Sequence, residues 1–303
     1  MPSDLPSSTQ TAPPQAAVVI PHYNDTERLD RCLGALAPQV EGQPVEVLVV
    51  DNGSTQDLAP LIAAYPFARF VTEPSKGAAP ARNRGVAEST APWLFFLDAD
   101  CVPAADWLRT ALAIGGVEGI LGGQVTLFDE TPAPRSGAEA FETVFGFPQQ
   151  DYVERKGFSV TANLLTTRSV FEAVGPFDGT LAEDIDWCRR AGRAGYPIAY
   201  RPELEVAHPT RSDWPALRKK WRRIAHEGYI FHGTAPGQRL SWALRGLAMP
   251  LSALVHLPRV LTSPRLASSA ERRAGAWILL RLRLLRMGWM LSQAAGFRSG
   301  RGR

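Results

Sequence analysis

Cysteine is scarce in this sequence, and its distribution excludes two kinds of small, cross-linked fold. The 303 residues contain only Cys32, Cys101 and Cys188, which lie far apart and form no Cys-x-x-Cys pair. An odd and dispersed set predicts neither a disulfide framework nor a zinc knuckle. We therefore expect a reducing, cytoplasmic setting.

The N-terminus lacks the features of a secretory signal. Residues 1–15 are rich in Pro, Ser and Thr, with neither a basic start nor an apolar core, and we expect a flexible tail there. The whole chain has an ordinary globular composition, with 45% hydrophobic and 21% charged residues. This composition excludes disorder of the entire chain.

Acidic residues are scarce in the last third. Residues 211–303 contain 18 Lys and Arg against 3 Asp and Glu, a net charge of +15, whereas residues 1–210 carry a net charge of −12. This asymmetry predicts an acidic body that uses cations and a basic region that faces phospholipid headgroups, phosphates or nucleic acid. Because no RNA or DNA motif accompanies the basic region, we expect no nucleic-acid partner.

The first half alternates short β-branched runs with helix-like stretches, a pattern typical of βαβ units on a mostly parallel sheet. We expect strands over 16–20, 46–50, 69–72 and 93–97, and helices over 25–37, 57–64 and 78–89, with Asp25 and Asp57 as N-caps.

The second half gives weaker signals at first and then helical ones. We expect strands and loops without helices over 119–167, a helix over 181–194, short strands over 198–200 and 204–207, a basic helix over 214–231 and apolar helices over 240–261 and 274–295.

Three of the expected strands run directly into polar residues. Pro21 to Asn24 follow the first strand, Asp51 to Ser54 the second, and Asp98 to Asp100 the fourth. In an open α/β sheet, ligands bind at the carboxyl ends of the strands. The three clusters are therefore expected to converge on one crevice.

The Asp98-Ala99-Asp100 triplet follows a strongly apolar strand, so two carboxylates stand at a buried strand end. Two such charges repel unless a cation neutralises them. Mg²⁺ or Mn²⁺, bridging the carboxylates to a diphosphate, fits this chemistry. The alternative interpretation is that Asp100 caps a helix beginning near Pro103.

Three further motifs precede this triplet along the chain: residues 20–24 (IPHYN), 49–54 (VVDNGS) and 76–85 (KGAAPARNRG). Together they resemble the nucleotide-binding half of family 2 glycosyltransferases, which have the GT-A fold. Residues 162–164, 174–178 and 181–190 resemble the acceptor-side segment of the same family. The resemblance covers residues 16–208 and leaves the C-terminal third outside it. Cys101 departs from the family pattern, in which many members carry a further acid.

The resemblance implies a nucleoside-diphosphate sugar donor and a set of residues to bind it. Asp51 would hydrogen-bond the base, Pro21 and Tyr23 would wall the base and ribose, and Arg82 would lie near the base or diphosphate. Ordinary structural roles are the alternative: Asp51 could cap the turn at Gly53, and Tyr23 could simply pack.

The metal ligands are likewise implied by the resemblance. Asp98 would touch the ribose or the metal, and Asp100 would bind the metal directly. His208 ends an expected strand at a position where family members often place a metal-binding histidine. A lone histidine is, however, more often a hydrogen-bonded structural residue.

Inverting sugar transfer requires a general base that takes the acceptor proton. The resemblance favours Asp184, at the start of an expected helix, as this base, with Glu183 supporting the acceptor or a loop. Adjacent carboxylates on a helix point about 100° apart, so only one of them can face the crevice squarely. The alternative is that both acids stabilise the helix N-terminus through its dipole.

The C-terminal apolar stretches are not ordinary membrane spans, because Arg245 and Arg259 interrupt the first, and Arg281, Arg283 and Arg286 interrupt the second. An amphipathic helix lying in the membrane plane, with Trp277 and Trp289 at headgroup level, fits better. Core packing or dimerisation is the alternative. The basic residues of 211–223 could reach a diphosphate or form a solvated or lipid-facing surface.

The sequence thus predicts an inverting, metal-dependent glycosyltransferase, peripheral at the inner face of the cell membrane, with a glycan or lipid-linked acceptor. The expected domains are the tail, a GT-A domain over 16–210 with halves 16–118 and 119–210, and a basic, membrane-associating helical region over 211–303. A catalytically silent scaffold that binds nucleotide sugars or membranes is the alternative.

Overall fold

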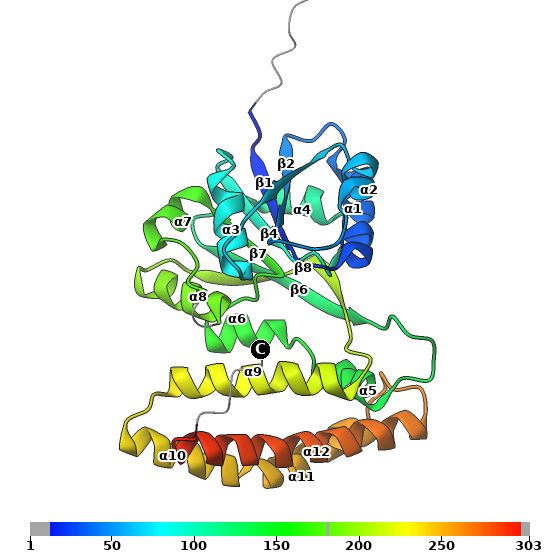
Figure 1. Ribbon diagram of the computed structural model, residues 1–303, viewed down its shortest axis with the longest axis vertical. Helices are drawn as coiled ribbons and strands as arrows, with labels where there is room; N and C mark the ends of the chain where they lie inside the picture. Colours follow the sequence, from blue (N-terminus) through cyan, green and yellow to red (C-terminus); the bar gives the residue numbers. More distant parts are fainter. Residues whose placement is uncertain (1–12, 180–181, 298–303) are drawn as a thin grey trace, which may run out of the picture. The chain divides into compact units, whose positions relative to one another are not determined.

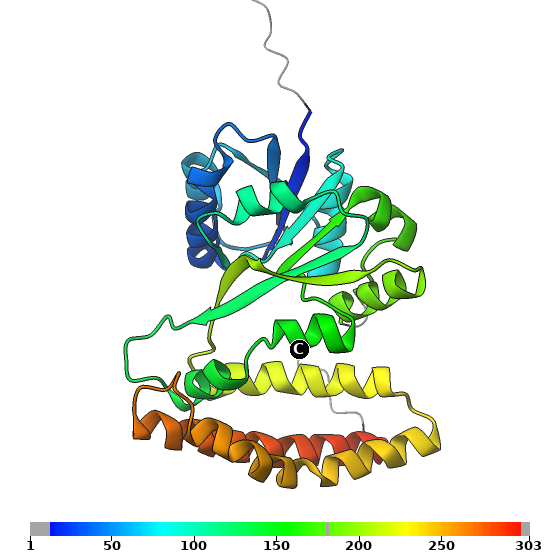
Figure 2. The ribbon, with the colours of Figure 1, turned by 180° about the vertical axis from the view of Figure 1, so that it is seen from behind.

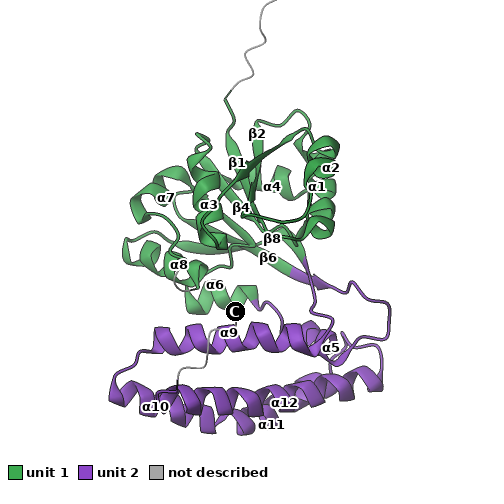
Figure 3. Cartoon of the chain, viewed as in Figure 1, with its two compact units in different colours: residues 1–125, 149–207 green, residues 126–148, 208–303 purple. Residues whose placement is uncertain are grey.

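The computed structural model describes residues 13–179 and 182–297. Residues 1–12 of the expected tail, and the expected helix start at Leu181, lie outside this part of the chain. The chain divides into two compact units: unit 1 comprises 1–125 and 149–207, and unit 2 comprises 126–148 and 208–303 (Figure 3). Segment 126–148, which the sequence pattern assigned to the GT-A domain, therefore groups with the C-terminal helices.

The central element is an eight-stranded sheet with the order β3-β2-β1-β4-β7-β6-β8-β5. Its strands are β1 (Ala16–His22), β2 (Val45–Asp51), β3 (Ala68–Thr72), β4 (Trp93–Leu97), β5 (Val102–Pro103), β6 (Ile120–Phe128), β7 (Asn163–Thr167) and β8 (Ile198–Pro209). Strands β1 to β4 pair in parallel, and β7 pairs antiparallel with both β4 and β6. The four strands expected in the first half are confirmed to within two residues at each end.

Helices cover both faces of the sheet in unit 1, as Figures 1 and 2 show from opposite sides. One face carries α3 (Ala78–Ala87), α7 (Arg168–Val174) and α8 (Glu183–Arg193), and the other carries α1 (Thr26–Val40), α2 (Ala59–Ala64) and α4 (Trp107–Ile114). The mixed α/β architecture with a GT-A type sheet agrees with the expected fold class.

Alternation along the strands explains this two-sided core. In β4, Phe96 packs edge-on against Phe177, whereas its neighbour Phe95 packs against Trp107 of α4. Successive side chains of a strand point to opposite faces, so an entirely apolar strand requires cover on both sides. Gly85 allows α3 to lie close to the sheet, because a Cβ at this position would overlap the side chain of Val19.

The structure corrects several sequence-based element assignments. Segment 119–167 contains two helices, α5 (Gly137–Phe145) and α6 (Gln149–Lys156), in addition to strands. Ser136 and Glu139 form a capping box at the start of α5, a local signal that the sequence interpretation missed. The two short strands expected over 198–207 are one continuous strand, β8.

The two predicted caps differ in outcome. Asp25 is the N-cap of α1, as predicted, but its side chain makes no capping hydrogen bond there. The N-cap of α2 is Leu58 rather than Asp57. Asp57 still accepts a hydrogen bond from the amide of Ala59 at 2.9 Å, because its carboxylate reaches back to the first turn.

Unit 2 is a bundle of α5 with α9 (Trp214–His232), α10 (Pro236–Leu247), α11 (Met249–Leu261) and α12 (Ser269–Ala294). The single helix expected over 240–261 is instead two helices bent by 44°. Pro250 lies in the first turn of α11, where its missing N–H is tolerated but would interrupt a continuous helix. The core of the bundle joins Phe141 of α5 to Leu279 and Leu282 of α12.

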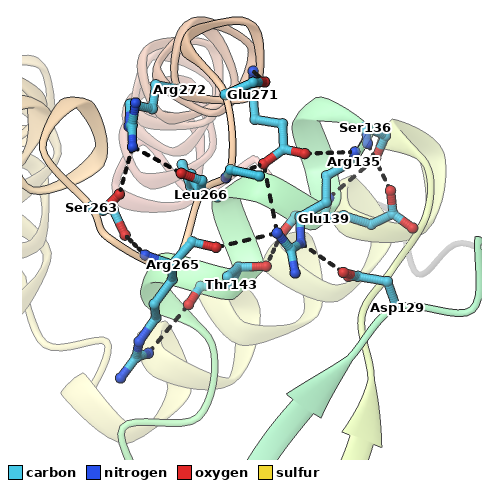
Figure 4. Close-up of polar contacts among 12 residues, drawn as sticks. Asp129, Arg135, Ser136, Glu139, Thr143, Ser263, Arg265, Leu266, Glu271 and Arg272 are labelled. Carbon is cyan, nitrogen blue, oxygen red and sulfur yellow. Dashed lines mark hydrogen bonds and ion pairs between the residues drawn. The ribbon is translucent and has the colours of Figure 1, made fainter. Parts of the chain in front are cut away.

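A polar cluster fixes the N-terminal end of α12 in this bundle (Figure 4). Arg135 donates to Asp129 at 2.6 Å through Nε and lies 3.6 Å from the buried carboxylate of Glu271. Glu271 also accepts the backbone amides of Arg135 and Ala267, at 3.1 and 2.9 Å. These amides help keep the pKa of Glu271 below its ordinary value, although burial alone would raise it.

Candidate active site

The ends of β1 and β4 and the start of α3 enclose a cavity of about 240 Å³ in unit 1. Its lining consists of Pro21, His22, Tyr23, Asp25, Asn52, Ala78, Ala81, Arg82, Asp98, Ala99 and Asp100. The convergence predicted from the polar strand ends is therefore present. Parallel pairing of β1 with both β2 and β4 produces it, because their carboxyl ends share one edge of the sheet.

Asp51 is held at the end of β2 by a network that includes a histidine. Its Oδ1 lies 3.4 Å from Nδ1 of His22, and its carboxylate accepts the amide of Ser54 at 3.2 Å. The His22 Nε2 accepts the amide of Asp25 at 3.2 Å. A neutral His22 must therefore carry its proton on Nδ1, where it can donate to Asp51. Asp51 thus caps the turn at Gly53. It is not itself one of the residues that line the cavity, whereas its neighbours His22 and Asn52 are.

Two asparagines that the sequence interpretation did not single out as site residues shape the loops around the cavity. Asn24, with a positive φ of 49°, accepts the amides of Thr55 and Gln56 through its side chain. Asn52 accepts the amide of Gly77 at 2.6 Å and so fixes the loop before α3. The sequence feature that could have identified them is an asparagine just after each strand. Asparagine adopts positive φ and hydrogen-bonds to nearby backbone more readily than most residues.

Arg82 is the most deeply buried cation of the site, with only 3% of its surface exposed. Its guanidinium donates to Oδ1 of Asp98 and, at 2.8 Å, to Oε1 of Glu183. Burial lowers the pKa of Arg82, but the two carboxylates more than compensate and raise it above its ordinary value. Arg82 therefore links the strand end of β4 to the start of α8.

Asp98 and Asp100 both line the cavity, on either side of Ala99. Cys101, the next residue, is buried, and burial and then the charges of Asp100 and Asp98 raise the pKa of its thiol. The described residues contain no group of three or more His, Cys, Asp or Glu side chains placed to hold a metal. Three carboxylates line the cavity of unit 1: Asp25, which pairs with Arg28, and the pair Asp98 and Asp100. The pair Asp98 and Asp100 suits a hard cation that completes its shell with phosphate oxygens and water.

His208 is the second-to-last residue of β8 and belongs to unit 2, where it is buried. Its ring lies 4.7 Å from that of Phe147, and its Nδ1 is 2.7 Å from the carbonyl oxygen of Pro209. A carbonyl oxygen only accepts, so Nδ1 carries the proton. This tautomer leaves Nε2 in the form in which a neutral histidine binds a metal.

The adjacent acids at the start of α8 face different neighbours, as the helical geometry predicts. Glu183 pairs with Arg82, whereas Asp184 accepts the amide of Ile185 at 2.8 Å. Burial, followed by the charge of Asp184, raises the pKa of Tyr152 in α6 to about 12. Of the remaining predicted residues, Pro21 lies in β1, and Tyr23 is 55% exposed at the cavity.

The other motif residues tie elements together. Asn163 is fully buried, accepts from Trp107 Nε1 at 3.0 Å and donates to the carbonyls of Gln124 and Leu204. Asn83 exchanges two hydrogen bonds of 2.9 Å with the backbone of Phe177. These contacts join strands and helices far apart in the sequence, so part of the motif pattern is structural.

Comparison with known proteins agrees with this arrangement. The model of glycosyl transferase family 2 matches residues 17–161, and that of glycosyl transferase family group 2 matches residues 93–295. Glycosyltransferase AglE of Haloferax volcanii is 31% identical, in a match covering 93% of this chain and 95% of that protein. Pre-mycofactocin glycosyltransferase of Mycobacterium tuberculosis is 29% identical over 82% of this chain, which spans 57% of that relative.

Among solved structures, a mannosyltransferase from Pyrobaculum calidifontis, in complex with GDP-Man and Mn²⁺, has a similar fold. The TM-score is 0.57 and the identity 19%, over 95% of this chain and 88% of the other. The family models, the relative matched over nearly its whole length and the GT-A type sheet lead to one conclusion: the chain belongs to glycosyl transferase family 2 and is a glycosyltransferase.

Proposed function

We propose that this glycosyltransferase uses a nucleoside-diphosphate sugar and a divalent cation, both bound in the cavity of unit 1. The observation that carries the proposal is the pair Asp98 and Asp100 on the wall of a cavity built from the carboxyl ends of parallel strands. The mannosyltransferase of similar fold binds GDP-Man and Mn²⁺, and its bound groups have the chemistry that this cavity would accept.

The residues proposed to bind the donor have distinct parts. Pro21 and Tyr23 would pack against the base and ribose, because both offer apolar surface at the rim. Asp51, fixed by His22 and Ser54, would accept a hydrogen bond from the base. Arg82 would hold Asp98 in place and add positive charge near the diphosphate.

Asp100 and Asp98 would hold Mg²⁺ or Mn²⁺ in the cavity of unit 1. The metal role expected of His208 stays a prediction from the sequence, because that residue belongs to unit 2. The bound cation would neutralise the diphosphate and the charge that develops on it as it leaves. The protein's own task is to hold the carboxylates: Asp98 is held through its ion pair with Arg82, and both follow the rigid, buried strand β4.

The proposed reaction is a single displacement that inverts the configuration at the anomeric carbon of the sugar. An acceptor hydroxyl forms the new C–O bond, the bond to the diphosphate breaks, and the nucleoside diphosphate leaves with the bonding electrons. A carboxylate takes the hydroxyl proton, and Asp184 is the proposed base. Glu183 would support the acceptor side through its ion pair with Arg82.

A glycan or lipid-linked acceptor at the inner, cytoplasmic face of the cell membrane is the proposed partner. No single helix among the described residues is long and apolar enough to cross a membrane, although the bent pair α10 and α11 meets the length and composition criteria together. Large apolar side chains are exposed along this pair: Leu240, Leu244, Leu247, Leu251, Leu254 and Val255. With a net charge of +15 over 211–303, such a surface suits peripheral binding to anionic lipid.

A panel of nucleoside-diphosphate sugars, tested with the purified chain by thermal shift and slow donor hydrolysis, tests the donor and the metal. We expect one donor to raise the melting temperature with Mn²⁺ or Mg²⁺ and to lose this effect in EDTA. Asp100→Asn should abolish the metal-dependent shift, whereas Asp106→Asn, a matched change at an exposed acid of the same unit, should retain it. Equal donor affinity with and without EDTA would contradict the metal site, and a chain that binds donor without any turnover would be a silent scaffold.

A further inference from the structure

Three arginines near the middle of α12 have surroundings that the sequence alone did not reveal. Arg281 is exposed, and its Cζ lies 4.1 Å from the ring centroid of Trp214. Arg286 is partly buried, with its Cζ 4.7 Å from the ring centroid of Trp221 on α9. Arg283 lies one turn before Arg286, and its Nη1 is 3.8 Å from the sulfur of Met249. Arg283 and Arg286 therefore face into the bundle of unit 2.

Neither of these two partly buried arginines has a carboxylate partner within residues 13–179 and 182–297. Two buried acids of the same unit are engaged elsewhere: Glu142 pairs with Arg211 and Lys220, and Glu271 with Arg135. From Gly228 to the C-terminus the sequence contains twelve arginines and a single acid, Glu271. In the part of the chain that the structure describes, these two cationic side chains therefore form no ion pair with a carboxylate.

Two buried donors in the same place lack acceptors. Arg286 Nε and the indole Nε1 of Trp221 are both inaccessible to solvent, and neither has a hydrogen-bond partner in the part of the chain described. Buried N–H groups are nearly always paired, since an unpaired one loses its bonds to water without replacement. Burial, and then the charge of Arg283, lowers the pKa of Arg286 to about 10. The site is therefore deficient in acceptor oxygens and in negative charge.

We propose that Arg283, Arg286 and Trp221 form a binding site for a phosphate group. Two guanidinium groups match the charge of nearly −2 on a phosphate monoester, whereas a carboxylate would neutralise only one of them. A guanidinium also donates in a planar fork that fits phosphate oxygens. The three residues belong to unit 2, and the donor residues proposed above belong to unit 1, so the two proposals stand separately.

The phosphate can come from a membrane lipid or from a soluble molecule, and the shared chemistry of both is the phosphate itself. Met249, which contacts Arg283, begins α11 between the exposed side chains of Leu247 and Leu251. This neighbourhood makes a lipid phosphate a source worth testing directly. Two probes separate the sources: inorganic pyrophosphate, and vesicles of phosphatidylcholine with or without phosphatidic acid.

The experiment uses the full chain in EDTA, which suppresses metal-dependent diphosphate binding at the donor site. Pyrophosphate binding is measured by calorimetry at constant ionic strength, and vesicle binding by flotation. Arg286→Gln and Arg283→Gln are each compared with Arg273→Gln, an exposed arginine of the same helix whose loss changes the net charge equally. Trp221→Phe retains a stacking ring but removes the indole N–H.

We expect saturable binding of at least one probe, weakened about tenfold or more by Arg286→Gln and Arg283→Gln, several-fold by Trp221→Phe, and hardly at all by Arg273→Gln. If these variants weaken binding to phosphatidic acid vesicles alone, the site binds a lipid phosphate. If they weaken binding of pyrophosphate alone, the site binds a soluble phosphate. Arg286→Gln should also raise the melting temperature without ligand, because it removes an unpaired buried charge. Two results would overturn the site. In the first, all four variants bind both probes as tightly as the wild type does. In the second, the wild type binds neither probe and Arg286→Gln lowers the melting temperature, which would leave these residues a packing role only.

Discussion

At the scale of single residues, Arg82 connects the two halves of the proposed chemistry. It lies between Asp98, at the end of β4, and Glu183, at the start of α8. Glu183 therefore pairs with Arg82, whereas Asp184, one residue later, accepts the amide of Ile185. This difference makes the two acids separable by mutation.

Asp184→Asn should reduce kcat by about 10²–10⁴-fold and leave the donor affinity nearly unchanged, because it removes only the proton acceptor. Glu183→Gln should instead raise the acceptor KM, since the ion pair with Arg82 that supports the acceptor side is lost. Steady-state kinetics with the donor identified by the panel measures both. A wild-type rate for Asp184→Asn would exclude it as the base and make Glu183 the next candidate.

A second residue-scale prediction concerns Glu142, which is buried and accepts from Lys220 at 2.6 Å and from the amide of Arg211 at 2.8 Å. Burial raises its pKa, but the charges of Lys220 and Arg211 hold the net pKa below the ordinary 4.5. Because the folded pKa is the lower one, the stabilisation is present above about pH 4.5 and is lost as the pH falls through the folded pKa.

Glu142→Gln should therefore lower the free energy of unfolding at pH 7 by about 3 kcal/mol, since it leaves two cations without a partner. It should also flatten the loss of stability on the acid side. Denaturant titrations between pH 3 and 7 measure this, with the exposed Glu118→Gln as control. The same pH profile in both variants would show that Glu142 contributes no net charge stabilisation.

At the scale of elements, α10 and α11 present an apolar surface that the bundle does not cover. Leu240, Leu244 and Leu247 recur at helical spacing on α10, and Leu251, Leu254 and Val255 do so on α11. Trp277 of α12 is also exposed, but Trp289 packs against the core of unit 2. The two tryptophans expected at headgroup level therefore have different environments.

Changing Leu251 and Leu254 together to Ser should weaken binding to anionic vesicles by more than tenfold, because each exposed leucine contributes about 1.5 kcal/mol when buried in lipid. The melting temperature should hardly change, since both side chains are at least 60% exposed. Ile62→Ser, at an exposed position of α2, is the control. Vesicle sedimentation at low and high salt measures the effect, and unchanged binding of the double variant would exclude this surface.

At the scale of the whole molecule, the C-terminal helices complete a core that begins much earlier in the chain. Phe141 and Val144 of α5 pack in one cluster with Ile278, Leu279 and Leu282 of α12. The alternative weighed from the sequence, core packing of the apolar helices, therefore holds for the inner face of α12. Membrane binding remains a proposal for the outer surface of α10 and α11.

Truncation after Gly233 should consequently expose the apolar faces of α5 and α9 and produce an aggregating or dye-binding protein. Size-exclusion chromatography and dye fluorescence measure this outcome. A monomeric truncated chain with a cooperative melt would show that unit 1, α5 and α9 are stable without the last three helices. Loss of vesicle binding by an aggregated truncation would carry no information, so the leucine variant is the better test.

The sequence by itself determined the strands β1 to β4, their polar ends and the family. The alternation of strand-like and helix-like segments, the turn residues and the motif spacing are local features that can be recognised along the chain. Tertiary structure alone decided the grouping of 126–148 with unit 2, the ion pairs of Arg82 and the partial burial of Arg283 and Arg286. Each of these depends on which distant residue packs against it. Burial and charge pairing are properties of neighbours in space, and no local pattern specifies who those neighbours are.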